Sequence, residues 1–244
     1  MSDQSTSEGD KQRRKEEKKE GKFARARAAA EASAGGQLEL RDGYALYQYP
    51  DYDTYREVQS QGNKAKLKAQ FVRESHIQLL ADIVLKNAPE PDFGLCHGTR
   101  RGAEQSWFRT HLGSKARVIG TEISDTATQF PDTLQWDFHD ENPDWESRAD
   151  FVYSNSWDHA FDPLKAFGAW IKSLKPGGLL LLDHTRGHSP KTADALDPFG
   201  ISLEKLISMI TEAFGDQGEI QPVFDSGKVN PEYAASVVIF RKNG

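Results

Sequence analysis

Short groups of polar residues follow the apolar stretches of this 244-residue sequence, and their types could support ligand binding or catalysis. Glycine lets a ligand approach bare backbone, carboxylates accept hydrogen bonds from hydroxyls, and histidine has a pKa near neutrality that suits proton transfer. Such groups stand at five points: Cys96-His97-Gly98, Glu122-Ile123-Ser124, Asp137-Phe138-His139, Asn155 to His159, and Asp183-His184.

Two glycines, Gly98 and Gly102, enclose Thr99-Arg100-Arg101 directly after an apolar run. A ligand could lie against this backbone, and the amides at the start of a following helix would favour an electron-rich or anionic group. The alternative is that the glycines only permit a tight turn and close helix packing. The dinucleotide fingerprint G-x-G-x-x-G needs a glycine where Arg100 stands, so this turn departs from it.

An acidic residue, Glu122, ends the next predicted strand and lies 24 residues beyond Gly98. At that spacing a carboxylate reaches the ribose hydroxyls of a nucleotide-like ligand in a βαβ unit. The alternative is an ordinary surface glutamate. The pair of features favours a nucleoside-binding site.

Four residues that follow the fourth and fifth predicted strands are candidates for a general base: Asp158, His159, His184 and His188. A base must remove a proton if the reaction makes a hydroxyl or protonated amine into a nucleophile. Each of them could instead cap a helix or bond to the backbone. We take Asp158, His159 and His184 as the catalytic candidates.

The histidines and carboxylates at the same sheet edge could also supply metal ligands. However, the six residues concerned form neither an H-x-x-x-H motif nor a paired-carboxylate spacing with one another, and we predict no metal. The residues in question are His97, His139, Asp158, His159, Asp183 and His184.

The order of apolar and amphipathic stretches predicts an α/β fold, with a doubly wound, mostly parallel, seven-stranded, Rossmann-like sheet. Strands are expected at 93–98, 116–123, 133–138, 149–156 and 179–185, with helices between most of them. Two final strands, within "GEIQPVFDSG" and "AASVVIFRK", leave no room for a helix and should form a C-terminal antiparallel hairpin. Such sheets bind ligands beyond the carboxyl ends of their strands, where the five polar groups fall.

Three segments are predicted along the chain. Residues 1–36 are charged and then alanine-rich, and they nearly lack large apolar residues, so a disordered tail is expected. This tail is either simply solvated or an arm that contacts a partner. Residues 37–72 are rich in tyrosine and helical from about Tyr52, and residues 73–244 form the main domain.

Composition narrows the functional classes. A net charge of −6 argues against general nucleic-acid affinity, which needs a basic surface. Among the 244 residues, no apolar run approaches the ~20 needed to cross a bilayer, and the one cysteine cannot form an internal disulfide. The sequence therefore predicts a cytoplasmic protein without a membrane span.

Over residues 73–244 the motifs resemble the class I S-adenosylmethionine-dependent methyltransferases, in the broad group that acts on small molecules. The resemblance rests on "LCHGTRRGAE", "VIGTEIS", "LQWDFHD" and, most strongly, "DFVYSNSWDHAFDPLKAFGAWIKSLKPGGLLLLDHT". It implies cofactor contacts of four kinds. The methionine part would lie beside His97, Gly98, Thr99 and Gly102, the ribose at Glu122, the adenine at Ile123, Asp137 and Phe138, and the sulfonium at Asn155 and Ser156.

The resemblance implies methyl transfer from S-adenosylmethionine to an oxygen or nitrogen atom of a small molecule, such as a sugar or an aromatic metabolite. It also implies that the tyrosine-rich segment, residues 37–72, forms a lid over this acceptor; the alternative is that its rings only cover the open edge of the sheet. Two alternatives stay open: an NAD-type oxidoreductase on a similar sheet, and a non-catalytic nucleotide-binding module that recruits a partner through its tail. A homo-oligomer is also compatible with the sequence.

Overall fold

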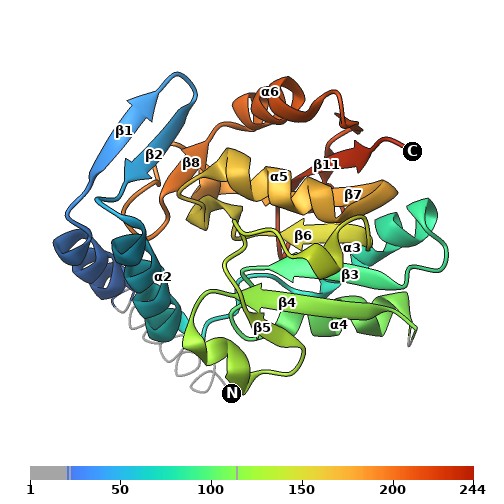
Figure 1. The fold of residues 1–244 in the computed structure, drawn as a ribbon, viewed down its shortest axis with the longest axis horizontal. Helices are drawn as coiled ribbons and strands as arrows, with labels where there is room; N and C mark the ends of the chain where they lie inside the picture. Colours follow the sequence, from blue (N-terminus) through green and yellow to red (C-terminus); the bar gives the residue numbers. More distant parts are fainter. Residues whose placement is uncertain (1–20, 22, 114) are drawn as a thin grey trace, which may run out of the picture.

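The structure is a computed structural model that describes residues 21, 23–113 and 115–244, and at its centre is a mostly parallel sheet (Figure 1). Within these residues the strand order is β10-β11-β7-β6-β3-β4-β5, and β9 also pairs with β11. Neighbours from β7 to β5 run parallel, whereas β11 is antiparallel to β7, β9 and β10. The predicted fold class is confirmed. The strands are β3 (Phe93–His97), β4 (Arg117–Glu122), β5 (Thr133–Gln135), β6 (Ala149–Ser154), β7 (Leu174–His184), β9 (Gly218–Ile220), β10 (Phe224–Asp225) and β11 (Ser236–Lys242).

The predicted final hairpin forms, but its first strand is divided into β9 and β10. β9 pairs with one end of β11, at Phe240, and β10 pairs with the other end, at Val237. Pro222 lies between the two short strands and has no N–H group to donate to the ladder. The seven strands expected from the sequence therefore become eight among the described residues.

Two helical layers cover the sheet, because alternate strand residues point to opposite faces. α3 (Glu74–Asn87) and α4 (Ala103–Leu112) pack on the face that carries Cys96 and Leu181. α5 (Pro163–Ser173) and α6 (Leu203–Phe214) pack on the face that carries Leu95 and Leu180. Each face thus has its own apolar core, as expected for strands buried on both sides.

The helix that follows β3, α4, begins at Ala103 and not directly after the strand. Gly98, Arg100 and Gly102 have positive φ angles of 73°, 47° and 73°, which a right-handed helix does not allow. Residues 98–102 therefore form a turn that leads from β3 into α4.

Residues 37–48 are a hairpin rather than a helix. β1 (Gln37–Arg41) pairs with β2 (Tyr44–Gln48), and β2 pairs with β8 (Phe199–Ile201) in a second, antiparallel sheet. The helical pattern from Tyr52 is confirmed as α2 (Tyr52–Lys66), which begins after Asp51, whose side chain accepts a hydrogen bond from the N–H of Thr54. Figure 1 places α2 across the carboxyl ends of the parallel strands.

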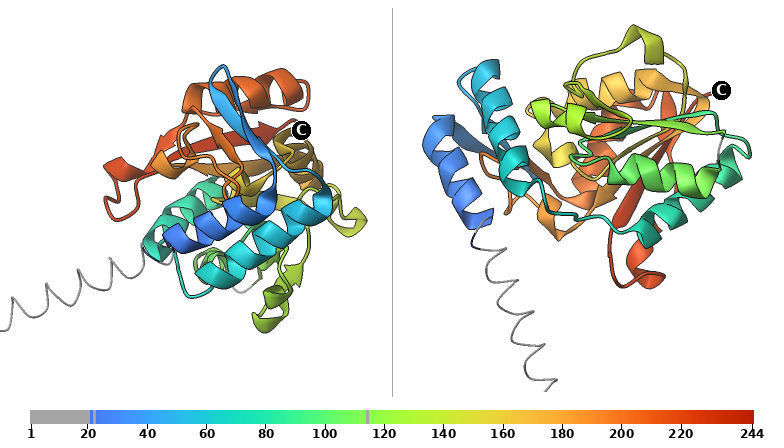
Figure 2. Two further views of the ribbon diagram at one scale, coloured as in Figure 1. Left: turned by 90° about the vertical axis from the view of Figure 1, so that its left-hand side faces the viewer. Right: turned by 90° about the horizontal axis from the view of Figure 1, so that it is seen from below.

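The expected disordered tail includes residues 23–34, which the structure places in a helix beside α2 (Figure 2). Ala30 and Ala34 of this helix are buried against Tyr47, Val58 and Leu196. The segment orders because other elements supply the large apolar side chains that it lacks. Residues 1–20 of the predicted tail lie outside the described residues.

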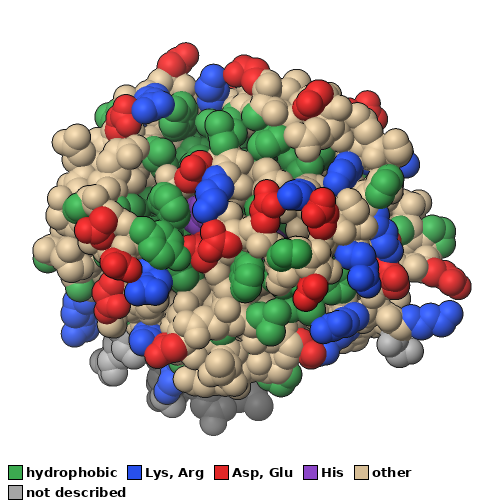
Figure 3. Space-filling model, in the orientation of Figure 1, with side chains coloured by type: hydrophobic (Ala, Val, Ile, Leu, Met, Phe, Trp, Pro, Cys, Tyr) green, Lys and Arg blue, Asp and Glu red, His purple; other side chains and the backbone are tan. Residues whose placement is uncertain are grey.

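No helix in the described part of the chain is long and apolar enough to cross a membrane. On the face seen in Figure 3, acidic and basic side chains are intermingled, with small apolar areas between them.

Candidate functional site

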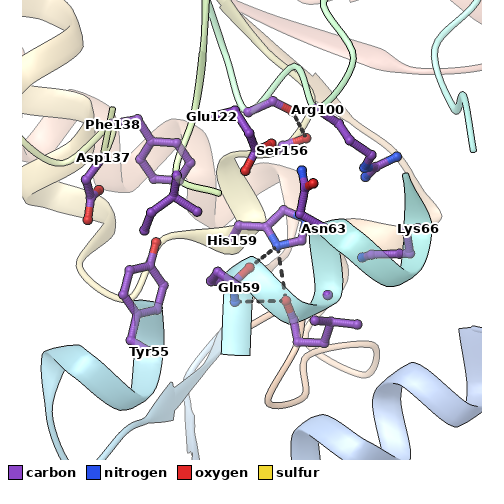
Figure 4. Close-up of a pocket in the computed structure, with 14 residues that line it drawn as sticks. Tyr55, Gln59, Asn63, Lys66, Arg100, Glu122, Asp137, Phe138, Ser156 and His159 are labelled. Atoms are coloured by element: carbon purple, nitrogen blue, oxygen red, sulfur yellow. Dashed lines mark hydrogen bonds between the residues drawn. The ribbon is translucent and has the colours of Figure 1, made fainter. Parts of the chain in front are cut away.

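A first cavity lies between the carboxyl edge of the sheet and α2. In Figure 4, α2 presents Tyr55, Gln59, Asn63 and Lys66 from one side. The sheet side contributes residues that the sequence predicted for a cofactor, namely Gly98, Glu122, Ile123, Asp137, Phe138 and Ser156. The volume of this cavity is about 40 Å³, which is room for only a few water molecules. A nucleoside could enter only if α2 moved outward.

Glu122 is buried in this cavity, with 7% of its surface exposed. Its Oε1 accepts a hydrogen bond from the Ser124 N–H at 3.1 Å. Burial raises the pKa of the Glu122 carboxyl, while the Ser124 hydrogen bond and the charge of Arg100 act in the opposite direction. A carboxylate at this place can accept hydrogen bonds from ligand hydroxyls.

The backbone conformation and the close neighbours of residue 98 require a glycine at this position. Its φ is 73°, and a Cβ atom at this position would lie 2.7 Å from the Cβ of Ser156. The N–H groups of Gly98 and Thr99 both donate to the carbonyl of Thr121, at 3.0 and 3.1 Å. Any larger residue would therefore displace the turn from Ser156 and from the cavity. Gly102 lines neither this cavity nor the two described below, and it forms the N-cap of α4.

Asp137 and Phe138 form the far wall of the first cavity. Asp137 accepts hydrogen bonds from the His139 N–H at 2.9 Å and from the Tyr52 hydroxyl at 2.8 Å, which links the segment after β5 to α2. The bonds to His139 and Tyr52 outweigh burial and lower the pKa of Asp137. This carboxylate is therefore ionised at neutral pH.

His97 does not face the cavities, although the resemblance implied a cofactor contact there. Its Nδ1 bonds to the Thr121 hydroxyl at 2.8 Å, and its ring stacks on Trp170 of α5 at 4.8 Å. Burial lowers its pKa to about 3, so the ring is neutral. The alternation of β3 places this side chain under α5.

A second cavity of about 460 Å³ adjoins the first and shares Lys66, Arg100, Ser156, His159 and Leu196 with it. This volume suits a small molecule. Asp158 lies in the wall of the second cavity, as do Asn155 and His188. Asp158 is 8% exposed, and its Oδ1 has no hydrogen-bond partner among the described residues. Burial raises the pKa of this carboxyl to about 7.

His159 also reaches the second cavity, and its tautomer follows from its partners. Nδ1 lies 2.7 Å from Gln59 Oε1 and 3.0 Å from the carbonyl of Leu196. The Gln59 amide nitrogen donates to the Leu196 carbonyl, which fixes the orientation of the amide. The two atoms near Nδ1, Gln59 Oε1 and the Leu196 carbonyl oxygen, are therefore both acceptors. Nδ1 therefore carries the proton, and the neutral ring has its lone pair on Nε2, 3.7 Å from Asp197 Oδ1.

His184, the third catalytic candidate, is outside both cavities. Its Nε2 donates to the carbonyl of Ile201 at 2.8 Å, and its ring lies over Trp157. His188 lines the second cavity, but Nδ1 accepts from the Thr185 N–H and Nε2 donates to the carbonyl of Asn155. With both nitrogens engaged, His188 is poorly placed to act as a base.

A third, small cavity of about 10 Å³ lies under the Gly98–Gly102 turn. Three of its buried polar atoms have no hydrogen-bond partner among the described residues: Thr99 Oγ1, Arg100 Nε and Glu104 Oε2. The other oxygen of Glu104 accepts from the Gln70 amide at 2.8 Å. A guanidinium and a carboxyl therefore face one small space together.

Sequence reasoning missed several side chains of the site. Those on α2, together with Leu196 and Tyr233, reach the cavities only through tertiary packing. Arg100 could have been identified from the sequence, because it stands where the dinucleotide fingerprint has a glycine. It lines all three cavities.

The ligand atoms of Asp158, His159 and Asp197 lie within 4.8 Å of one another, a spacing that could hold a metal ion. Asp197, however, already binds two cations, Arg27 at 2.8 Å and Lys66 at 3.5 Å. Because these side chains supply the positive charge that an ion would bring, we assign no metal to this cluster.

No protein-family model matches the sequence, and no curated protein matches it either. Solved structures do match. The 1,6-didemethyltoxoflavin-N1-methyltransferase of Burkholderia thailandensis, with bound 1,6-didemethyltoxoflavin and S-adenosylhomocysteine, has a TM-score of 0.60 at 13% identity, over 86% of this chain and 99% of that chain.

Two further structures are similar. The N-methyltransferase NodS of Bradyrhizobium japonicum, in complex with S-adenosylhomocysteine, has a TM-score of 0.56 at 17% identity, over 76% of this chain and 99% of that chain. The sugar N-methyltransferase KedS8 of a Streptoalloteichus species has a TM-score of 0.54 at 15% identity, over 74% and 91%. The chain therefore has the fold of the S-adenosylmethionine-dependent methyltransferases.

Proposed function

We propose that this protein is an S-adenosylmethionine-dependent methyltransferase that acts on an oxygen or nitrogen atom of a small molecule. The observation that carries the proposal is the buried carboxylate of Glu122 beside the Gly98 turn, at the carboxyl edge of the sheet. The shared fold and the S-adenosylhomocysteine bound to two of the similar structures support it. A cytoplasmic location stays a prediction that rests on the single cysteine.

The polar groups of the first and third cavities fit this cofactor. Glu122 would accept from the ribose hydroxyls, and Ile123, Asp137 and Phe138 would surround the adenine. The unpartnered Arg100 Nε and Glu104 Oε2 complement a carboxylate and an ammonium group, which are the two charges of a methionine end. Gly102 would support the turn rather than touch the ligand.

When bound, the cofactor supplies a methyl group that is already activated on a sulfonium. The task of the protein is then to align the acceptor and to exclude water. Asn155 and Ser156 line the second and third cavities, so the reactive carbon belongs at their junction. The acceptor would lie in the second cavity.

Asp158 is the base that the site supports best. It lies in the second cavity with an unpartnered oxygen, and its pKa of about 7 suits proton transfer near neutrality. His159 would orient Gln59 and the Leu196 loop, with Nε2 as a second acceptor of protons. His184 has no route to the acceptor, because its Nε2 bonds to Ile201.

Calorimetric titration with S-adenosylhomocysteine tests the proposal. We expect the wild-type protein to bind it and Glu122→Ala to bind at least about tenfold more weakly, because hydrogen bonds to a charged group are worth roughly 1.5–3 kcal/mol each. Glu90→Ala, a matched change at an exposed position, should leave the affinity unchanged.

The same titration with NAD tests the main alternative, an NAD-type oxidoreductase. Binding of NAD without binding of S-adenosylhomocysteine would refute the proposed function. Binding of S-adenosylhomocysteine with no methyl transfer to any acceptor, tested with labelled donor, would favour the non-catalytic module.

A further inference from the structure

The carboxylate of Asp158 has no cation paired with it in the described part of the chain. Its Oδ1 has no hydrogen-bond partner among the described residues, and its Oδ2 lies 3.7 Å from Nε2 of the His188 ring. Burying an ionised carboxylate without a partner costs several kcal/mol. In the empty cavity a proton can relieve this cost, as the raised pKa of Asp158 indicates. Because Asp158 lines the second cavity, a cationic ligand there can take the place of that proton.

The cations around the second cavity are engaged with other groups. Arg27 bonds to Asp197 at 2.8 Å and to Asp194 at 2.9 Å, and Lys66 lies 3.5 Å from Asp197. The Arg100 guanidinium lies over the Phe71 ring at 5.1 Å and donates to the carbonyl of Ala69. None of these contacts is to Asp158, although the charge of Lys66 acts on its carboxyl without an ion pair and favours the ionised form.

The two histidines beside Asp158 do not compensate it either. Burial lowers the pKa of both His159 and His188, so the rings are neutral near pH 7. The lone pair of His188 Nδ1 is used by the Thr185 N–H. Tyr233 and Glu232, which also line the cavity, add no positive charge.

We propose that the methyl acceptor is a primary or secondary amine, which enters the second cavity as a cation and places its nitrogen against Asp158. The inference rests on the proposed methyl-transfer function and specifies its substrate class. A neutral hydroxyl could donate one hydrogen bond to the carboxylate, but it would bring no positive charge to it. An ammonium group provides both the hydrogen bond and the charge.

Methyl transfer to an amine needs only Asp158 and the methyl donor, and its atoms and charges balance. The ammonium N–H gives its proton to Asp158, and the freed lone pair of nitrogen forms the new N–C bond. The C–S bond of the sulfonium breaks, and its electron pair stays on sulfur. The methylated ammonium product carries the positive charge that the sulfonium has lost, and the proton on Asp158 passes to solvent when the cavity opens.

The test uses labelled methyl donor and acceptors in matched pairs, benzylamine with benzyl alcohol and glucosamine with glucose, extended to further aromatic and sugar amines with their alcohols. We expect transfer to amines and not to the alcohols of the same skeleton. Asp158→Asn should lower kcat/KM for the amine about 100-fold or more, as for loss of a general base. Asp82→Asn, on the exposed side of α3, is the matched control and should change nothing.

Titration with S-adenosylhomocysteine accompanies each variant. Its affinity should stay within about twofold in Asp158→Asn, which shows that the variant is folded and that the effect is on the acceptor. Transfer to alcohols alone, amine methylation that survives Asp158→Asn, or transfer to no amine by protein that binds S-adenosylhomocysteine would overturn the inference. A wild-type protein that does not bind S-adenosylhomocysteine would remove the proposed function as well.

Discussion

Arg100 shows how a single residue can depart from a motif and gain a role. It stands where a dinucleotide fingerprint has its middle glycine, and it accepts a left-handed backbone with φ 47°. Such a conformation is unfavourable for a non-glycine residue by roughly 1 kcal/mol or more. The turn directs the guanidinium to the small cavity that Thr99 and Glu104 also line.

We predict that replacing Arg100 weakens binding of the amino-acid end of the cofactor but not binding of its nucleoside end. Arg100→Met should weaken S-adenosylhomocysteine binding about tenfold or more, because the variant loses a charge-assisted hydrogen bond to the methionine carboxylate. Binding of methylthioadenosine, which lacks the amino-acid end, should change by less than about twofold. Calorimetric titration of both ligands measures the difference.

Arg101→Met is the matched control, since the neighbouring Arg101 is exposed and should affect neither ligand. Glu104→Gln should resemble Arg100→Met, because the amino group would lose the negative charge beside it. Equal losses for both ligands in Arg100→Met would mean that Arg100 supports the whole turn rather than the amino-acid end.

Among the elements, α2 has the contacts expected of a helix that covers the first cavity and can move away from it. Its buried side chains are largely polar, and two of them bond to neighbouring segments: Asn63 to Thr126 at 2.9 Å and Gln59 to the carbonyl of Leu196 at 3.1 Å. The exposed Lys64 also pairs with Asp125 at 2.9 Å. By contrast, α3 buries Ile77, Leu80 and Val84 in an apolar core. Elements with few buried apolar contacts open at lower free energy.

We therefore predict that the backbone amides of α2 exchange with solvent faster than those of α3, and that S-adenosylhomocysteine slows the exchange in α2. The first cavity is too small for a nucleoside, so access requires α2 to move, and the bound ligand would then hold it. Hydrogen exchange followed by mass spectrometry measures both effects. Equal protection of α2 and α3, unchanged by ligand, would contradict this prediction.

The elements also show what the sequence could predict. Apolar runs and their polar ends located the main sheet and placed Glu122 at its edge, because strands buried on both faces have a simple pattern. The pairing of β2 with β8 joins residues about 150 positions apart through a three-residue strand, which no local pattern marks. His184 could not be excluded from the sequence, since its hydrogen-bond partner, Ile201, belongs to β8, the short strand that no local pattern marks.

In the whole molecule, the fully buried Asp183 connects four separate parts of the chain. His76 of α3 bonds to its Oδ1 at 2.9 Å, while Tyr153 of β6 and Tyr233 of the loop before β11 donate to its Oδ2 at 2.7 and 3.1 Å. Asp183 itself belongs to β7. Tyr233 also lines the second cavity, so this network fixes one wall of the proposed acceptor site to the core.

Removing the carboxylate should therefore affect stability more than removing any one of its partners. We expect Asp183→Ala to lower the free energy of unfolding by about 3–5 kcal/mol, because the buried His76 and Tyr153 and the partly buried Tyr233 lose their partner at once. Tyr233→Phe should cost only about 1 kcal/mol, since it removes one hydrogen bond and keeps the ring. Urea unfolding followed by circular dichroism measures both values. Similar losses in the two variants would mean that Asp183 contributes one contact among many rather than a junction between four parts of the chain.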